Sequence, residues 1–165
     1  MTGRRTELIS KNTDKAKLKE DYVIRVTGTQ HYFPHGTEGE FDDKVEIDTL
    51  GAYCVRPSGK KIISYRGMDE SGDNGPLTIV KVEDNKLTMA KTGDHTELLV
   101  EPGKLNVCAY DTPYGALTLG VQAHGLNQTL DENGGSLQCT YSIYINNMIS
   151  SRNTLEIHVE KANLE

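Results

Sequence analysis

The sequence contains no tryptophan, only three cysteines and no long apolar run. No stretch approaches the roughly 20 apolar residues that a membrane-spanning helix needs. The opening "MTGRRTELISKNTDK" also lacks the apolar core of about 7–15 residues that marks a secretory signal. We therefore expect a cytoplasmic protein without a membrane span.

An excess of positive charge is absent as well. The chain has 18 Lys and Arg residues against 24 Asp and Glu residues, which gives a net charge of −6. Nucleic-acid binding depends largely on cationic side chains that neutralise phosphates. The charge balance therefore argues against a nucleic-acid partner.

The cysteine spacing lacks the common metal and redox motifs. Cys54, Cys108 and Cys139 each lie in a run of strand-forming residues, and none belongs to a Cys-x-x-Cys pair. Three cysteines cannot all pair within one chain, so we expect reduced, half-buried thiols. The sequence predicts neither a metal site nor a cofactor.

Sequence motifs of catalysis are also missing. The chain has no Gly-x-Ser-x-Gly elbow, no phosphate-binding loop and no dinucleotide glycine pattern. His95, His124 and His158 lie far apart in the sequence. We expect a non-catalytic protein, but a fold that brings one histidine to one carboxylate leaves no motif, so an enzyme remains an alternative.

What the sequence does have is alternation with a period of two. In "TLEIHVEK", Leu155, Ile157 and Val159 alternate with polar residues, and "LQCTYSIYIN" and "ALTLGVQAHG" repeat the pattern. Such alternation is typical of strands with one buried and one solvated face. Short polar breaks such as "RPSGK", "EDNK", "EPGK" and "DENGG" favour β-turns between antiparallel neighbours.

The pattern predicts an all-β fold, since no long segment has the spacing of an amphipathic helix. A chain of 165 residues is the size of one domain. We predict an antiparallel meander of about 8–10 strands that forms a single closed or nearly closed barrel, which hides its apolar faces and its edges. The barrel domain is expected to span residues 21–162, after a flexible polar N-terminal arm of residues 1–20.

The stretch "YDTPYG" has the composition of a tight turn. Pro113 fixes φ near about −65°, Gly115 tolerates the backbone that follows such a turn, and the Thr112 hydroxyl can bind turn amides. We therefore assign Thr112, Pro113 and Gly115 a structural role. Tyr114 is expected to cover one end of the core, with stacking on a ligand as the alternative.

Longer stretches of the chain resemble a known family. The segments "VTGTQ", "VEIDTLGAYCV", "LTIVKVEDNKLTMAKTG", "YDTPYGALTLGVQAHGL", "LDENGGSLQCTYSIYIN" and "NTLEIHVEK" have the order and spacing of the YwiB-like family of small bacterial proteins, from about Val23 to Lys161. This family is a domain of unknown function. The resemblance implies a calycin-like, or lipocalin-like, antiparallel barrel of about ten strands, with no established activity. The Gly-x-Trp signature of true lipocalins is absent, because the chain has no tryptophan.

Three hypotheses for function follow. The first is a protein that binds a small, partly apolar ligand in the barrel interior or mouth; its candidate lining residues are Tyr53, Tyr65, Tyr110, Tyr114 and Tyr141, with Arg66 to orient an acidic headgroup. The second is a protein-interaction module with a filled core. The third is a barrel enzyme that acts on a small molecule. Edge strands can also pair between copies, so the sequence allows a monomer or a homodimer.

Overall fold

Ten antiparallel strands follow the alternating stretches of the sequence. The computed structural model describes residues 19–36, 42–67, 75–92 and 97–163, apart from the side chains of Tyr110 and Asp111. The strands are β1 (Tyr22–Tyr32), β2 (Asp42–Val55), β3 (Lys61–Arg66), β4 (Leu77–Glu83), β5 (Lys86–Lys91), β6 (Leu98–Val100), β7 (Leu105–Thr112), β8 (Gly115–Gln128), β9 (Gly134–Ile145) and β10 (Met148–Lys161), with a short 3-10 turn, η1, at Pro34–Gly36. The predicted arm, residues 1–20, falls outside the described residues except for its last two.

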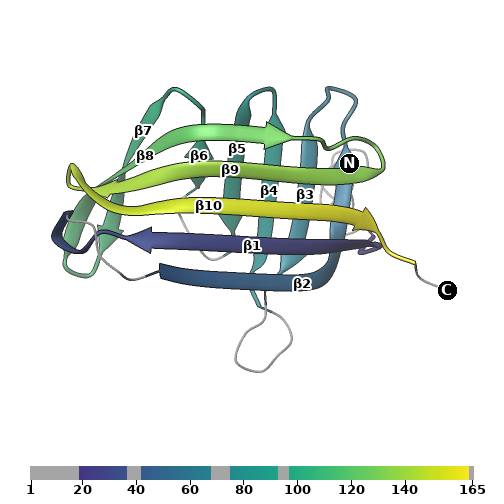
Figure 1. Cartoon of the computed structure of the whole chain (residues 1–165), viewed down its shortest axis with the longest axis horizontal. Coiled ribbons are helices and arrows are strands. Elements are labelled where there is room, and N and C mark those ends of the chain that lie inside the picture. Colours follow the sequence, from purple (N-terminus) through teal and green to yellow (C-terminus); the bar gives the residue numbers. More distant parts are fainter. Residues whose placement is uncertain (1–18, 37–41, 68–74, 93–96, 164–165) are drawn as a thin grey trace, which may run out of the picture.

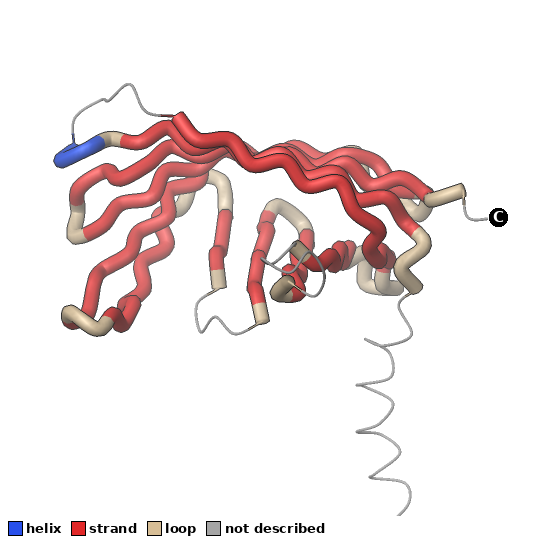
Figure 2. Tube along the Cα trace, turned by 90° about the horizontal axis from the view of Figure 1, so that it is seen from below, coloured by secondary structure: helices blue, strands red, loops and turns tan. Residues whose placement is uncertain are grey.

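The strands form one sheet that curls into a nearly closed barrel. The hydrogen-bonded order is β6-β5-β4-β3-β2-β1-β10-β9-β8-β7, with every neighbouring pair antiparallel. The long strands β1, β8, β9 and β10 lie across the front of the molecule, and β3, β4 and β5 cross behind them (Figure 1). Seen from below, the two groups of strands form facing layers (Figure 2). The predicted all-β barrel is confirmed.

The core lies between these layers and is built from the inward residues of each strand. Ile24 on β1 pairs with Val159 on β10, and Ile157 on β10 pairs with Leu137 on β9; all four side chains are fully buried. From the crossing strands, Ile63, Val80, Leu87 and Val100 meet them. Burying each large aliphatic side chain contributes about 1.5–3 kcal/mol to folding, so this cluster is the main source of stability.

Gly51 is the corner at which β2 passes from one layer to the other. The pairing of β2 with β1 ends at Gly51, and its pairing with β3 begins at the same residue. A Cβ at this position would lie 2.7 Å from Ile24 Cγ1 and would overlap the Ser64 carbonyl oxygen. The strands can cross this closely only because glycine has no side chain.

The barrel has a seam between β6 and β7, the two strands at the ends of the sheet order. They are consecutive in the chain and are joined by a turn in which Lys104 N donates to the Glu101 carbonyl at 3.0 Å. From this turn the two strands diverge, and β6 packs against β8 instead of pairing with β7. Side-chain packing, rather than backbone hydrogen bonding, therefore closes the barrel here.

Replacing Gly51 with alanine should destabilise the protein, because the added Cβ clashes with backbone as well as with a core side chain. We expect the free energy of unfolding to fall by about 1–3 kcal/mol, as for overpacked cores. Urea unfolding followed by circular dichroism measures the change. Gly28→Ala on β1 is the control, since no atom lies within 4 Å of a Cβ there. Equal losses in the two variants would contradict the role given to Gly51.

Candidate functional site

One end of the barrel is closed by Tyr53. Its buried side chain points inward, and its hydroxyl donates to the Asp131 carbonyl oxygen at 2.6 Å in the loop between β8 and β9. The Tyr22 ring packs edge-on against it with centroids 5.4 Å apart, and Leu130, buried beside Asp131, belongs to the same core. Burial, reinforced by the Asp131 carboxylate, raises the pKa of Tyr53 to about 12. The Tyr53 side chain therefore has a structural role at this end of the barrel, because its ring is packed in the core and its hydroxyl is already hydrogen-bonded.

Two further tyrosines place hydroxyl groups inside the barrel. Burial raises the pKa of Tyr65, although a hydrogen bond with Thr78 partly opposes the shift. Burial also raises the pKa of Tyr141, with smaller contributions from Cys139 and Tyr65. Both phenols are therefore neutral at physiological pH, when each has a proton to donate.

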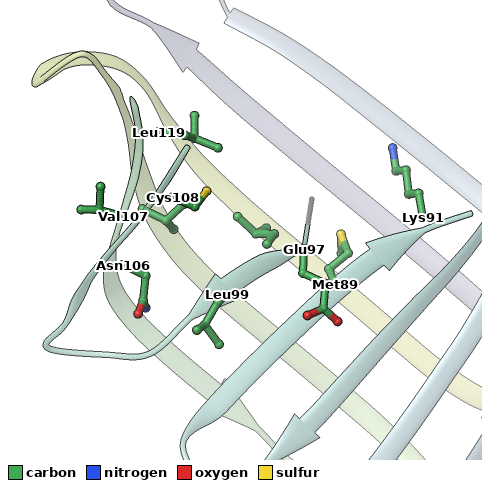
Figure 3. A pocket seen from close by; sticks show the side chains of 10 residues that line it. Met89, Lys91, Glu97, Leu99, Asn106, Val107, Cys108 and Leu119 are labelled. Carbon is green, nitrogen blue, oxygen red and sulfur yellow. The ribbon is translucent and has the colours of Figure 1, made fainter. Parts of the chain in front are cut away.

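A pocket of about 370 Å³ opens at the seam, where β6 and β7 diverge (Figure 3). Its walls are mostly apolar and come from four strands. The lining residues are Met89 and Lys91 of β5, Glu97 and Leu98–Leu99 at β6, Asn106–Cys108 of β7, and Leu119 and Val121 of β8. The volume lies within the range of about 300–1,000 Å³ found for small-molecule sites.

Asn106 contributes an uncharged polar group to the wall of this seam pocket, beside the charged Lys91 and Glu97. Its side-chain nitrogen, Nδ2, is buried and has no hydrogen-bond partner among the described residues. A buried donor without an acceptor costs about 1–3 kcal/mol, so such groups are rare in folded proteins. The pocket therefore presents a donor that a ligand carbonyl or carboxylate would satisfy.

A second pocket, of about 410 Å³, lies beside the first at the same end of the barrel. Tyr65, Arg66 and Thr78 line it together with Lys91, which also lines the seam pocket. Within the described part of the chain, Lys91 forms no ion pair. Together the two pockets define a barrel mouth with Lys91 between them, opposite the end that Tyr53 closes.

The structure brings together only some of the predicted site residues. Tyr65 and Arg66 meet at the second pocket, where Arg66 Nη1 also donates to the Gly75 carbonyl at 3.3 Å. Tyr53 and Tyr141 lie inside the barrel, away from both pockets of the mouth. Tyr110 lies on β7, and its side chain is outside the described part.

Tyr114 stands at the tip of the β7–β8 hairpin, and its side chain is 99% exposed. It covers no end of the core, unlike the packing expected from the sequence, because the hairpin tip projects beyond the barrel. In the same turn the Thr112 hydroxyl donates to the Gly115 carbonyl at 2.6 Å and accepts from Tyr114 N at 3.1 Å. Gly115 has a φ of 120°, which favours glycine, and Pro113 precedes Tyr114 in the turn.

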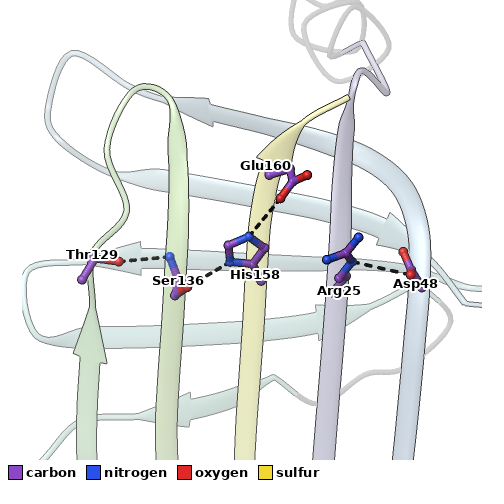
Figure 4. Close-up of polar contacts among 6 residues, drawn as sticks. All are labelled: Arg25, Asp48, Thr129, Ser136, His158 and Glu160. Carbon is purple, nitrogen blue, oxygen red and sulfur yellow. Dashed lines mark hydrogen bonds and ion pairs between the residues drawn. The ribbon is translucent and has the colours of Figure 1, made fainter. Parts of the chain in front are cut away.

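A row of polar residues runs over the outer face of β9 and β10 (Figure 4). Ser136 Oγ lies 3.0 Å from His158 Nδ1, and His158 Nε2 lies 3.3 Å from Glu160 Oε2. These residue types also form hydrolytic triads, which need an oxyanion site beside the nucleophile. All three side chains are exposed, and neither pocket of the barrel mouth reaches them. The row therefore gives no support to the enzyme hypothesis.

The described residues contain neither a candidate metal cluster nor a helix that could span a membrane. No group of three or more His, Cys, Asp and Glu side chains there is arranged to hold a metal ion. No helix among those residues has the length and apolarity to cross a membrane.

Comparison with known proteins supports the fold and gives no activity. A family model described as a domain of unknown function, DUF1934, matches residues 24–157. The crystal structure of the ywiB protein from Bacillus subtilis superposes with a TM-score of 0.61 at 20% identity, covering 87% of this chain and 96% of that chain. At this identity the likeness shows the fold alone. A search of curated proteins gives no match. The resemblance found in the sequence is confirmed.

The raised pKa of Tyr53 predicts a loss of stability at alkaline pH. The ordinary value of 10 applies to the unfolded chain and about 12 to the folded one, so the unfolded state releases this proton first. The free energy of unfolding should therefore fall as the pH rises from 10 to 12. Urea unfolding at several pH values measures the slope.

Tyr53→Phe should reduce that slope, and it should also cost about 0.5–1.5 kcal/mol at neutral pH through the lost hydrogen bond. Tyr114→Phe is the matched control, because its ring is exposed at the hairpin tip. An unchanged slope in the Tyr53 variant would refute the assignment.

Proposed function

The chain belongs to the DUF1934 family of domains of unknown function, and from this premise we propose that it is a non-catalytic protein that binds a small, partly apolar ligand at the barrel mouth. The seam pocket takes the apolar part of the ligand. Asn106 donates a hydrogen bond to an acceptor on it. The observation that carries the proposal is the buried, unpartnered Nδ2 of Asn106 in an otherwise mainly apolar wall.

The polar end of the ligand is placed near Lys91. This ammonium group lies between the two pockets and forms no ion pair with the described residues, so it is available to an acidic or strongly polar headgroup. The hydroxyl groups of Tyr65 and Thr78 line the neighbouring pocket. Glu46 and Asp48 also line that pocket, and Glu97 lines the seam pocket, so the headgroup is placed at Lys91 itself, away from these carboxylates. A molecule with one apolar end and one small acidic or strongly polar end matches this arrangement.

The cysteines support a cytoplasmic location as part of the same proposal. Cys54, Cys108 and Cys139 are all free thiols, and Cys108 is exposed. An exposed free thiol is kept reduced in the cytoplasm, whereas extracellular compartments oxidise it.

A protein-interaction role is the second candidate, and the free edge of β7 favours it. Among the described residues no strand pairs with β7 on its seam side, because β6 pairs only with β5. The seam pocket opens in the same gap between β6 and β7, so a partner strand on this edge and a ligand in the pocket would compete.

Native mass spectrometry tests the main proposal. The protein is purified gently from its own host and measured before and after denaturation. A mass excess that disappears on denaturation would identify a retained ligand. Masses equal to the bare chain or its multiples, in several preparations and with the cell extract added back, would contradict the proposal.

Asn106→Leu should separate stability from binding. The variant removes an unpartnered buried donor, so we expect the free energy of unfolding to rise by about 1 kcal/mol, while the retained ligand mass decreases. Asn127→Leu is the control, because Asn127 is exposed on β8 and lies outside the pocket. It should leave the retained ligand mass unchanged and should not raise the free energy of unfolding. A stabilised Asn106 variant that keeps all of its ligand would refute the role of this side chain.

Replacing Lys91 with methionine should weaken binding of an anionic apolar probe. The fluorescent probe 8-anilinonaphthalene-1-sulfonate carries both an apolar ring system and a negative charge. We expect its dissociation constant to rise by roughly tenfold, which corresponds to about 1.4 kcal/mol. Lys86→Met is the control, because Lys86 lies at the other end of β5. Equal effects of the two substitutions would place the probe elsewhere.

A further inference from the structure

Strands β3 and β4 carry apolar residues on both of their faces. Ile63 and Val80 point inward and are fully buried in the core. Ile62 on β3 and Ile79 on β4 alternate with them, so they point to the outer face, where they are only partly buried. The outer face of an antiparallel sheet is normally polar, as it is on β9 and β10 (Figure 4). An apolar outer face is instead typical of a surface that binds another molecule.

A groove of about 450 Å³ lies on this outer face, between β3, β4 and the β2–β3 turn. Its apolar floor is formed by Ile62, Leu77 and Ile79, and its cations are Arg56, Lys60 and Lys81. The turn is closed by backbone bonds, since Arg56 N donates to the Lys60 carbonyl at 2.7 Å. On β4, Lys81 lies nearest to this turn, followed by Ile79 and then Leu77. The groove is therefore cationic at the turn and apolar at its other end.

Two of the three cations of the groove are available to a partner. Lys60 Nζ lies 3.7 Å from Glu83 Oε2 and is already paired. Arg56 and Lys81 are exposed, and neither forms an ion pair with any described residue. The described residues that line the groove include no acidic side chain. The groove thus presents unpaired positive charge beside an apolar floor, in a chain whose net charge is −6.

The form of the groove favours a protein segment over a small molecule as the occupant. Sites for small molecules usually bury about 70–90% of the ligand surface. This groove is bounded by one face of two strands and by one turn, so it cannot surround a small ligand in that way. An apolar centre with a charged rim is the common anatomy of protein interfaces, in which arginine is enriched. A chain segment can lie along such a groove and continue beyond it.

The charges decide which segment fits. The unpaired Arg56 and Lys81 are complementary to carboxylates. Residues 1–18 of the chain itself carry five basic residues against two acidic ones, so they have the same sign as the groove. An anionic membrane surface is disfavoured as well, because it would repel the net charge of −6 of the whole chain. A short acidic segment of another protein interacts mainly with the local positive charge.

We propose that the outer groove of β3 and β4 binds a short acidic peptide segment of a partner protein. Its carboxylates pair with Arg56 and Lys81, and an apolar side chain of the same segment packs on Ile79 or Leu77. Arg56 can hold a carboxylate through two parallel hydrogen bonds. Residues two apart on a strand are about 6.6 Å apart. In an extended segment the apolar residue therefore lies two or four positions from an acidic one.

Selection from a phage-displayed library of random peptides tests this proposal on the full chain. We expect the enriched peptides to share an acidic residue with an apolar residue two or four positions away. The most enriched peptide is then synthesised with a fluorescent label, and its dissociation constant is measured by anisotropy. Binding should weaken as the salt concentration rises, because exposed charge pairs are screened. A selection that enriches no peptide of this pattern would overturn the proposal.

Charge reversal places the labelled peptide on the protein. The double variant Arg56→Glu, Lys81→Glu should raise its dissociation constant by about tenfold or more, because like charges then face one another. The control is the double variant Lys44→Glu, Arg152→Glu, which changes the net charge by the same amount at exposed positions of β2 and β10 outside the groove. We expect the control to bind nearly as well as the natural chain. Equal weakening in both variants would show that the groove is not the binding site.

Ile79→Thr tests the apolar floor. Threonine keeps the branched shape that strands favour and removes apolar surface, so the dissociation constant should rise by about fourfold, the value for one buried methylene group. The circular dichroism spectrum should stay unchanged. Lys91→Met, at the barrel mouth, should leave peptide binding intact, which separates this site from the proposed ligand site. Sedimentation of the chain with vesicles of equal parts phosphatidylcholine and phosphatidylserine, without binding of any selected peptide, would assign the groove to a membrane surface and refute the proposal.

Discussion

The close crossing of β2 over its neighbours at Gly51 is the constraint on which the barrel depends. The long front strands are held together by β1 pairing with both β2 and β10, and the crossing strands begin with the pairing of β2 and β3. Gly51 belongs to both ladders, and its neighbours leave no space for a side chain at this position. The two layers face one another, and enclose a core, because β2 turns there.

The two ends of the barrel are chemically different as a result. At one end Tyr53 and Leu130 fill the space, and the Tyr53 hydroxyl is satisfied by the Asp131 carbonyl. At the other end β6 and β7 diverge, and the space between them is lined by apolar side chains, a buried amide, the Glu97 carboxylate and Lys91, which forms no ion pair within the described ranges. The Tyr53 hydroxyl is thus satisfied where the barrel is closed, whereas the Asn106 amide has no partner among the described residues where the barrel is open, as expected if the open end binds a ligand.

The sequence predicted the fold better than the site. Alternation of residues such as Leu155, Ile157 and Val159 depends only on local geometry, so the strands and their inward faces could be found without a structure. The seam pocket depends instead on which two strands fail to pair, a property of the whole sheet. Asn106 was missed for that reason, although its position on the inner face of a strand was a readable signal. Among the predicted aromatic residues, Tyr65 lines the mouth, whereas Tyr114 lies on a projecting hairpin.

The position of β1 in the sheet has a consequence for the order of folding. This strand comes first in the described sheet but lies between β2 and β10. Its ladder with β10 therefore joins the first strand of the sequence to the last one. As the chain leaves the ribosome, β1 can pair with β2 early, yet its other edge stays open until β10 has been made. The meander from β2 to β6 can form while the front layer is still incomplete. Synthesis of the final hairpin, β9 and β10, is thus the step that converts an exposed central strand into a covered one.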